Sequence, residues 1–215
     1  MACCAFDESV DDQFTRAKAQ DELRRYRERG PFPTTRLLLD GLGSAGLLEG
    51  TILDIGAGIG ALTFEALDRG CRRAIIVDAS SAYLTAASGE ATRRGRTGDI
   101  QLTKGDFVAV SGAVPAATVV ALDRVVCCYP SWPELLGAAL HHAESAIALS
   151  YPRDRWYVRL FQRLENTARR WRKNGFTTFV HPEGDMRAMI EGAGFRLVSR
   201  RGTLVWHADV YRRAG

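Results

Sequence analysis

From residue 50 onward, short apolar runs alternate with segments whose apolar residues recur every three or four positions. The short runs have the length and composition of buried strands, and the longer periodic segments are typical of amphipathic helices. Strand and helix in alternation predict an α/β fold built on a parallel sheet. Strands are expected at 51–53, 74–78, 100–103, 118–122 and 146–150, with the clearest intervening helix at 133–140.

The C-terminal part of the chain breaks this alternation. Met186, Met189 and Ile190 mark a short helix, and two strand-like segments follow it without a helix between them. Segments 196–199 and 204–211 therefore predict an antiparallel hairpin at the end of the sheet. The chain shows no internal repeat and no sign of a second unit, so residues 1–215 are expected to form one domain.

The first predicted strand runs into the sequence TILDIGAGIGALT, in which Gly56, Gly58 and Gly60 alternate with other residues. Glycine permits backbone conformations that let a ligand lie on a tight turn, and the following helix points its free N–H groups at the same place. Such a turn in an open sheet predicts a nucleotide-type cofactor, the alternative being a purely structural turn. A dinucleotide is disfavoured because it requires G-x-G-x-x-G.

Two acidic residues near the glycine turn indicate which nucleotide-type cofactor would fit. Asp54 precedes the glycine turn, and Asp78 ends the second predicted strand. A carboxylate after that strand can accept both hydroxyl protons of a ribose, whereas Asp54 would repel a pyrophosphate and attract a cation. The arrangement D-x-G-x-G-x-G, strand, acid resembles the class I S-adenosylmethionine-dependent methyltransferases. The runs DRVVCCYP and YPRDRW are similar to bacterial methyltransferase-domain proteins sometimes described as magnesium-protoporphyrin O-methyltransferase-like.

The resemblance implies a Rossmann-like, doubly wound, mostly parallel seven-stranded sheet with an antiparallel last strand. It also implies S-adenosylmethionine as cofactor and S-adenosylhomocysteine as product. The glycine turn would hold the amino-acid end of the cofactor, Asp78 the ribose and Asp106 the adenine, although Gly105-Asp106 is also a turn signal in its own right. The implied cofactor-binding residues are Tyr26, Asp54, Gly56, Ala57, Gly58, Gly60, Asp78, Ala79, Asp106, Phe107 and Leu122.

Three titratable side chains are candidates for catalytic work on a methyl acceptor. Asp123 and Tyr129 lie in the loop after the fourth predicted strand, where the resembled family places acceptor-facing groups. His181 precedes the last predicted helix. Each could orient or deprotonate an acceptor within hydrogen-bond reach, and a carboxylate acceptor would need no base. The alternatives are that Asp123 pairs with Arg124 and that His181 is structural.

Two segments fall outside the strand–helix alternation. Residues 1–45 are expected to form an N-terminal helical cap, in which Tyr26 and Arg27 would contact the carboxylate of the cofactor. Residues 151–180 form a lid insertion whose apolar residues predict one helical stripe beside a row of arginines. This helix could cover an anionic acceptor, rest on an anionic membrane through 155–173, or contact RNA phosphates; its arginines could also serve solubility alone. The stripe consists of Trp156, Leu160, Leu164, Ala168 and Trp171.

Composition narrows the partners only weakly. The net charge of +4 is a slight bias toward anionic partners. The chain lacks the basic, aromatic-rich module typical of RNA methyltransferases and the Asn/Asp-Pro-Pro-Tyr/Phe motif of many nucleic-acid amino-methyltransferases, so no DNA partner is expected and RNA is disfavoured. The acidic N-terminal residues lack the pattern of a signal peptide, which predicts the cytoplasm. The oligomeric state does not follow from the sequence.

The five cysteines include two adjacent pairs, Cys3-Cys4 and Cys127-Cys128. An odd number with this spacing is unlike a disulfide framework, so free thiols are expected. The alternative is a soft-metal or metalloid site in which the N-terminal pair folds over the second pair. No C-x-x-C spacing or histidine pair accompanies them, and no metal site is predicted.

Together these patterns predict an enzyme that transfers a methyl group from S-adenosylmethionine to a small-molecule acceptor. The methylated atom would be oxygen or nitrogen, and a carboxylate is one candidate acceptor. The alternatives are a non-enzymatic S-adenosylmethionine-binding protein, an RNA methyltransferase and a nicotinamide enzyme.

Overall fold

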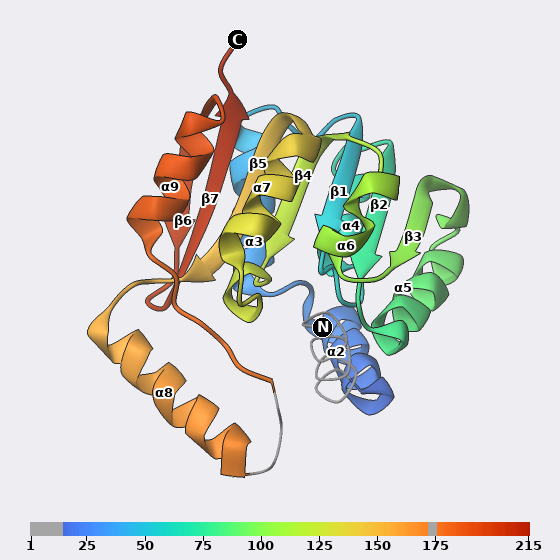
Figure 1. The fold of residues 1–215 in the computed structure, drawn as a ribbon. Coiled ribbons are helices and arrows are strands. Elements are labelled where there is room, and N and C mark those ends of the chain that lie inside the picture. The colour runs from blue at the N-terminus through green and yellow to red at the C-terminus, as the bar shows by residue number, and fades with distance from the viewer. Residues whose placement is uncertain (1–14, 172–175) are drawn as a thin grey trace.

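The computed structural model describes residues 15–171 and 176–215, which contain a seven-stranded sheet (Figure 1). The strand order is β3-β2-β1-β4-β5-β7-β6. The first five strands are parallel, and β7 lies between β5 and β6, antiparallel to both. The strands are β1 (Thr51–Ile55), β2 (Arg73–Asp78), β3 (Ile100–Lys104), β4 (Ala117–Asp123), β5 (Ala143–Pro152), β6 (Phe195–Gly202) and β7 (Trp206–Arg213).

The central strands are buried on both faces, which explains why they appear in the sequence as continuous apolar runs. Ile52 of β1 and Val119 of β4 belong to the core on one face, whereas Leu53 and Val120 belong to the core on the other. Each strand is longer than its apolar run because ladder pairing continues into the flanking residues. The fold class predicted from the sequence, including the antiparallel last strand, is confirmed.

Helices cover both faces of the sheet (Figure 1). Each face has its own apolar core, with Leu136 and Phe195 in one and Leu39 and Leu67 in the other. The first face carries α6 (Phe107–Val110), α7 (Trp132–His142) and α9 (Glu183–Gly192), and the second carries α3 (Pro33–Ser44) and α4 (Ala61–Asp68), with α5 (Ser81–Arg93) beside α4. Three short turns complete the pattern: η1 (Thr97–Asp99), η2 (Ser111–Ala113) and η3 (Val126–Cys128).

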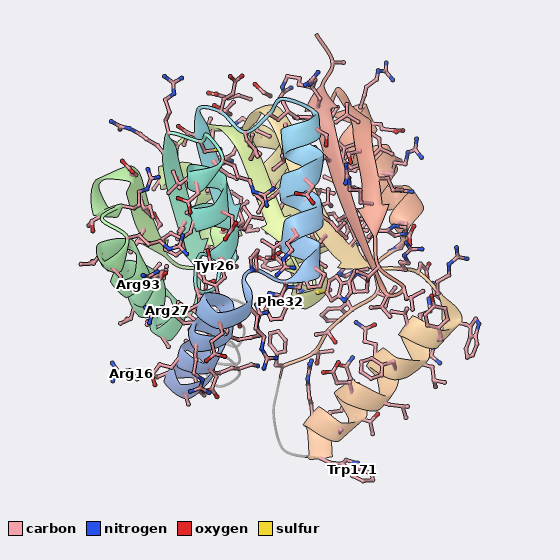
Figure 2. All side chains as sticks on the ribbon, turned by 180° about the vertical axis from the view of Figure 1, so that it is seen from behind. Arg16, Tyr26, Arg27, Phe32, Arg93 and Trp171 are labelled. Carbon is pink, nitrogen blue, oxygen red and sulfur yellow. The ribbon has the colours of Figure 1, made fainter. Side chains whose placement is uncertain are left out.

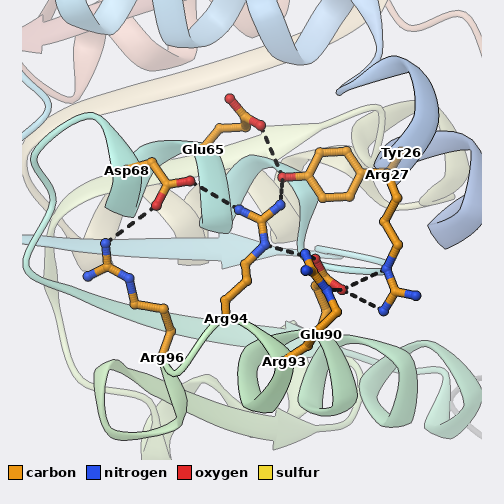
Figure 3. A network of polar contacts seen from close by, with 8 residues as sticks. All are labelled: Tyr26, Arg27, Glu65, Asp68, Glu90, Arg93, Arg94 and Arg96. Carbon is orange, nitrogen blue, oxygen red and sulfur yellow. Dashed lines mark hydrogen bonds and ion pairs between the residues drawn. The ribbon is translucent and has the colours of Figure 1, made fainter.

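Helix α2 (Arg16–Arg29) lies beyond the carboxyl ends of the parallel strands (Figure 1). Thr15 caps its first turn by accepting a hydrogen bond from the Lys18 N–H. Gly30 ends the helix at φ +74°, a conformation that favours glycine. Arg27 and Glu90 join α2 to α5 in a network of ion pairs (Figure 3). The N-terminal segment thus lies at the edge of the sheet where ligands of open α/β folds collect.

Helix α8 (Trp156–Trp171) occupies most of the 151–180 segment and extends away from the sheet (Figures 1 and 2). The predicted stripe is present, but Trp156, Leu160, Leu164 and Trp171 are exposed rather than packed on the body. Within the described ranges, no helix combines the length and the apolarity that a membrane span would require.

Candidate functional site

A cavity of about 450 Å³ opens at the carboxyl ends of the parallel strands. The loops after β1, β2, β3 and β4 supply its floor and walls through residues 54–59, 77–79, 105–107 and 123–125. This is the place where open parallel sheets bind ligands, because the loops diverge at the change in strand order. Other walls come from Lys18, Glu22, Phe32 and Thr35 on the N-terminal helices and from Arg169, Phe176 and Trp206.

The glycine turn forms one wall of the cavity. Gly56 and Gly58 adopt φ +63° and +57°, the left-handed region that glycine occupies without steric cost. A Cβ on Gly56 would lie 2.6 Å from the Val125 side chain, and one on Gly58 would lie 3.1 Å from the Tyr83 ring. The turn therefore needs glycine both for its backbone angles and for its close neighbours.

Asp78 fixes the turn from the next strand. One carboxylate oxygen accepts a hydrogen bond from the Gly58 N–H at 2.7 Å, and the other accepts from the Ser80 N–H at 2.8 Å. Asp78 is mostly buried but lines the cavity. Its carboxylate thus lies beside the glycine turn, at the strand end where a ribose-binding acid was predicted. Ala79, also predicted, lines the cavity beside it.

Asp54 lies beneath the turn, fully enclosed. Its carboxylate accepts a hydrogen bond from the Thr63 hydroxyl at 2.8 Å. Burial raises the pKa of Asp54 to about 7, and the nearby carboxylates of Asp123 and Asp78 act in the same direction. Because Asp54 also lines the cavity, a cationic ligand bound there would favour the ionised form of its carboxyl group.

Asp106 and Phe107 lie after β3 and line the same cavity. Asp106 accepts hydrogen bonds from the Val108 N–H at 3.2 Å and from the Tyr129 hydroxyl at 2.8 Å. The buried Phe107 ring lines the cavity next to it. A carboxylate beside an apolar ring suits an adenine, whose exocyclic amine donates hydrogen bonds while its ring requires apolar cover.

Asp123 lies at the end of β4, but its carboxylate is already bonded to protein hydroxyls. The Thr35 hydroxyl donates to one oxygen and the Ser150 hydroxyl to the other. One alternative was that Asp123 pairs with Arg124, but the structure shows no ion pair between these two side chains. Instead, Arg124 pairs with Glu22 at 3.6 Å and adopts φ +62°, which is uncommon for a residue other than glycine. This geometry directs the β4 loop across the cavity.

Three predicted cofactor-binding residues do not line the cavity. Tyr26 lies in the core between α2 and α5, where its hydroxyl donates to Glu65 and accepts from Arg94 (Figure 3). Leu122 is fully buried in the sheet core. Gly60 caps α4, where a Cβ would press on Phe64 at 3.1 Å. The structure thus gives these residues packing roles and corrects the assignment.

His181, predicted as a candidate base, is also outside the cavity lining. Its Nε2 lies 3.0 Å from the Val126 carbonyl oxygen and 3.2 Å from that of Tyr129. Both partners are acceptors, so Nε2 must carry the proton and donate it. Burial lowers the pKa of His181, which favours the neutral ring. The histidine therefore holds the turn after β4 in place, as the structural alternative proposed.

Several lining residues were not predicted from the sequence. Thr35 and Phe32 come from the start of α3, and Trp206 comes from the first residue of β7. Trp206 could have been predicted from the sequence, because an antiparallel last strand must begin at the edge of the sheet where the parallel strand beside it ends. No sequence pattern predicted that Lys18 and Arg169 would line the cavity, since both belong to charged helices whose positions depend on tertiary contacts.

The adjacent thiols of Cys127 and Cys128 lie 3.6 Å apart in the wall of the cavity. Both are free, as is Cys71. Within residues 15–171 and 176–215, no three histidine, cysteine or acidic side chains are grouped to hold a metal ion. Cys3 and Cys4, the other half of the hypothetical metalloid site, lie outside the described residues.

The sheet order, the antiparallel last strand and the cavity over a glycine turn define the class I methyltransferase fold. Magnesium protoporphyrin IX methyltransferase from Synechocystis PCC 6803, solved with bound S-adenosylmethionine, has a TM-score of 0.71 at 17% identity and covers 97% of both chains. An O-methyltransferase family protein from Burkholderia thailandensis has a TM-score of 0.73 at 16% identity, covering 97% of this chain and 62% of that one. The resemblance stated from the sequence is thus confirmed at the level of the fold.

Sequence comparison gives a shorter match. No protein-family model matches the chain. Ribosomal protein L11 methyltransferase from Edwardsiella ictaluri (strain 93-146) is 33% identical over 115 residues. That match covers 50% of this chain and 39% of the relative, so the two share well under half of the longer protein's length. Function must therefore be argued from the site itself.

Proposed function

We propose that this protein transfers a methyl group from S-adenosylmethionine to a small-molecule acceptor. The observation that carries the proposal is one cavity lined by the glycine turn, by Asp78 beside that turn and by Asp106 with Phe107. Each matches one part of the cofactor: the turn suits the amino-acid end, Asp78 the ribose and Asp106 with Phe107 the adenine. When bound, the cofactor supplies an activated methyl group on a cationic sulfonium. The chain itself has only to bind and align.

Two cationic side chains from the surrounding helices line the cavity, Lys18 on α2 and Arg169 on α8, and Arg169 is paired with Glu165 at 2.6 Å. Burial lowers the pKa of Lys18 and repulsion by the Arg169 charge lowers it further, whereas Glu22, which lines the same cavity, raises it. An anionic group placed between them would relieve that repulsion. An acceptor that carries a carboxylate therefore fits this side of the cavity.

The proposed roles of Asp123 and Tyr129 follow from their bonds. Asp123, held by two hydroxyls, is rigidly placed to orient a hydroxyl or amine acceptor. Tyr129 donates to Asp106 and so connects the adenine wall to the β4 loop. An acceptor carboxylate would react without a base, and these two residues would then act by positioning.

Ligand-induced stabilisation tests the cofactor assignment. S-adenosylhomocysteine is expected to raise the melting temperature of the protein, since a ligand that binds only the folded state stabilises it. NAD and NADP are expected to leave it unchanged. Stabilisation by NAD instead would establish the nicotinamide alternative. If S-adenosylhomocysteine binds but no phenol, amine, carboxylic acid or RNA is methylated, the non-enzymatic alternative holds; methylation of RNA alone would exclude a small-molecule acceptor.

Asp54 predicts how binding depends on pH. The pKa of Asp54 in the folded protein, about 7, exceeds the ordinary value near 4. Between these two pH values Asp54 is ionised in the unfolded chain but protonated in the folded one, so the free energy of unfolding falls as pH rises from about 4 to about 7. A sulfonium favours the ionised form. S-adenosylmethionine affinity is therefore expected to rise roughly fivefold between about pH 6 and 8, while the affinity of S-adenosylhomocysteine, which lacks the sulfonium charge, changes less. Calorimetry with both ligands checks this, and Asp54→Asn should remove the difference. Parallel pH slopes for the two ligands would contradict it.

A further inference from the structure

The most exposed apolar surface among the described residues lies on α8. Trp156, Phe161 and Trp171 are 77%, 69% and 86% exposed, and Leu160 and Leu164 lie between them on the same side. Large exposed apolar patches are rare on soluble proteins and mark interaction sites. The docking face is defined here as Trp156, Leu160, Phe161, Leu164 and Trp171, whereas the neighbouring Tyr157 donates its hydroxyl to the Leu204 carbonyl at 2.8 Å.

The other side of α8 is already fastened to the protein. Asn166 donates to the Thr178 carbonyl at 2.8 Å and accepts from the Thr178 N–H at 3.1 Å. The Arg169 guanidinium lies 5.5 Å from the centre of the Phe176 ring, and Val158 is buried. These residues occupy the half of the helix opposite the docking face. The apolar stripe therefore points away from the cavity.

Arginines run along one edge of the docking face. Arg155, Arg159, Arg163 and Arg170 follow each other at helical spacing and are exposed, with Arg159 paired to Asp154. The helix itself contains four arginines and one glutamate. A stripe of tryptophan, phenylalanine and leucine beside a row of arginines is the pattern of helices that lie in the interface of a membrane.

We propose that this face docks on the surface of an anionic phospholipid membrane. The tryptophans stand at the two ends of α8, and indole rings favour the headgroup region. The arginines would bind lipid phosphates, each contributing about 1 kcal/mol near an anionic surface. A second copy of the chain fits less well, because face-to-face packing would bring two rows of arginines together. RNA would leave the leucine and phenylalanine side chains unburied.

Docking would also set the position of the cavity. Arg169 faces the cavity from the fastened side of α8, so a membrane on the opposite side of the helix lies one helix diameter away, about 10 Å. The surface itself is inferred from exposure and charge, whereas this consequence rests on the proposed function.

Vesicle sedimentation tests the surface with a matched control. The protein is expected to sediment with vesicles of phosphatidylcholine and phosphatidylglycerol, and weakly with phosphatidylcholine alone. Phe161→Glu with Leu164→Glu should lower the affinity at least 50-fold, because two apolar side chains lose their burial. Arg163→Gln should lower it about fivefold on the anionic vesicles only. Val198→Glu, which places one carboxylate at an exposed apolar position on β6, should leave binding unchanged.

Folding and cofactor binding separate this surface from the proposed function. Each variant should keep its melting temperature and its affinity for S-adenosylhomocysteine, since the docking face lines neither core nor cavity. Equal binding of wild type and the Phe161–Leu164 variant to anionic vesicles would overturn the proposal. So would a concentration-dependent dimer that this variant abolishes, because the face would then belong to a second copy.

Discussion

Replacing Asp78 by alanine is expected to weaken S-adenosylhomocysteine binding about 100-fold. A hydrogen bond to a charged group contributes roughly 1.5–3 kcal/mol, and a ribose offers two hydroxyls to one carboxylate. Losing both would remove about 3 kcal/mol or more, which corresponds to two orders of magnitude in Kd. Isothermal titration calorimetry measures this directly.

The structure adds a second effect to that prediction. Asp78 also accepts the Gly58 and Ser80 N–H groups, so the alanine variant should lose about 1–2 kcal/mol of stability without ligand. Asp99→Ala is the matched control, because Asp99 on η1 is half-buried, lies outside the cavity lining and pairs with its neighbour Arg96. An Asp78→Ala protein that binds S-adenosylhomocysteine with unchanged affinity would refute the ribose assignment, whatever its stability.

Replacing Glu90 by glutamine is expected to destabilise the protein by roughly 3 kcal/mol. The Glu90 side chain is fully buried and contacts three arginines, with Arg27 at 2.7 Å, Arg93 at 2.5 Å and Arg94 at 2.8 Å (Figure 3). Removing its charge takes the buried partner from all three guanidinium groups, of which Arg94 keeps an ion pair with Asp68 at 3.0 Å. For a chain of this size the melting temperature should fall by about 6–12 °C. Because Arg27 belongs to α2, the variant should also loosen the helix that carries Lys18 to the cavity.

The same residue sets an acid limit on stability. Hydrogen bonds from Arg93 first, and then from Arg94 and Arg27, lower the pKa of Glu90 to about 2. A depressed carboxyl pKa stabilises the folded state fully above the ordinary value near 4.5, and that contribution is lost as pH falls toward about 2. Urea unfolding at stepwise lower pH should therefore show a smaller pH slope in Glu90→Gln than in the wild type.

Glu191→Gln provides the control for Glu90. Glu191 makes an exposed i,i+4 pair with Arg187, and such pairs contribute less than about 0.5 kcal/mol. The two substitutions have the same chemistry in different surroundings. Equal losses of stability would show that burial of the Glu90 network has no energetic consequence.

The sequence by itself determined the sheet and the edge of it at which the cavity opens. The apolar runs fixed the strands because strands buried on both faces must be apolar throughout. The glycine turn was readable because its backbone angles exclude other residues locally. Asp78 and Asp106 were placed correctly since every parallel strand in such a sheet delivers its carboxyl end to one edge.

Only the tertiary structure decided how distant segments meet at that edge. Thr35 reaches Asp123 across 88 positions of sequence, Tyr26 turns into a core and His181 supports a loop. None of these contacts has a local pattern, because they depend on how helices dock. The stripe on α8 shows the same division: helical periodicity fixed which residues share a face, but the hydrogen bonds of Asn166 on the opposite side determined that this face looks outward.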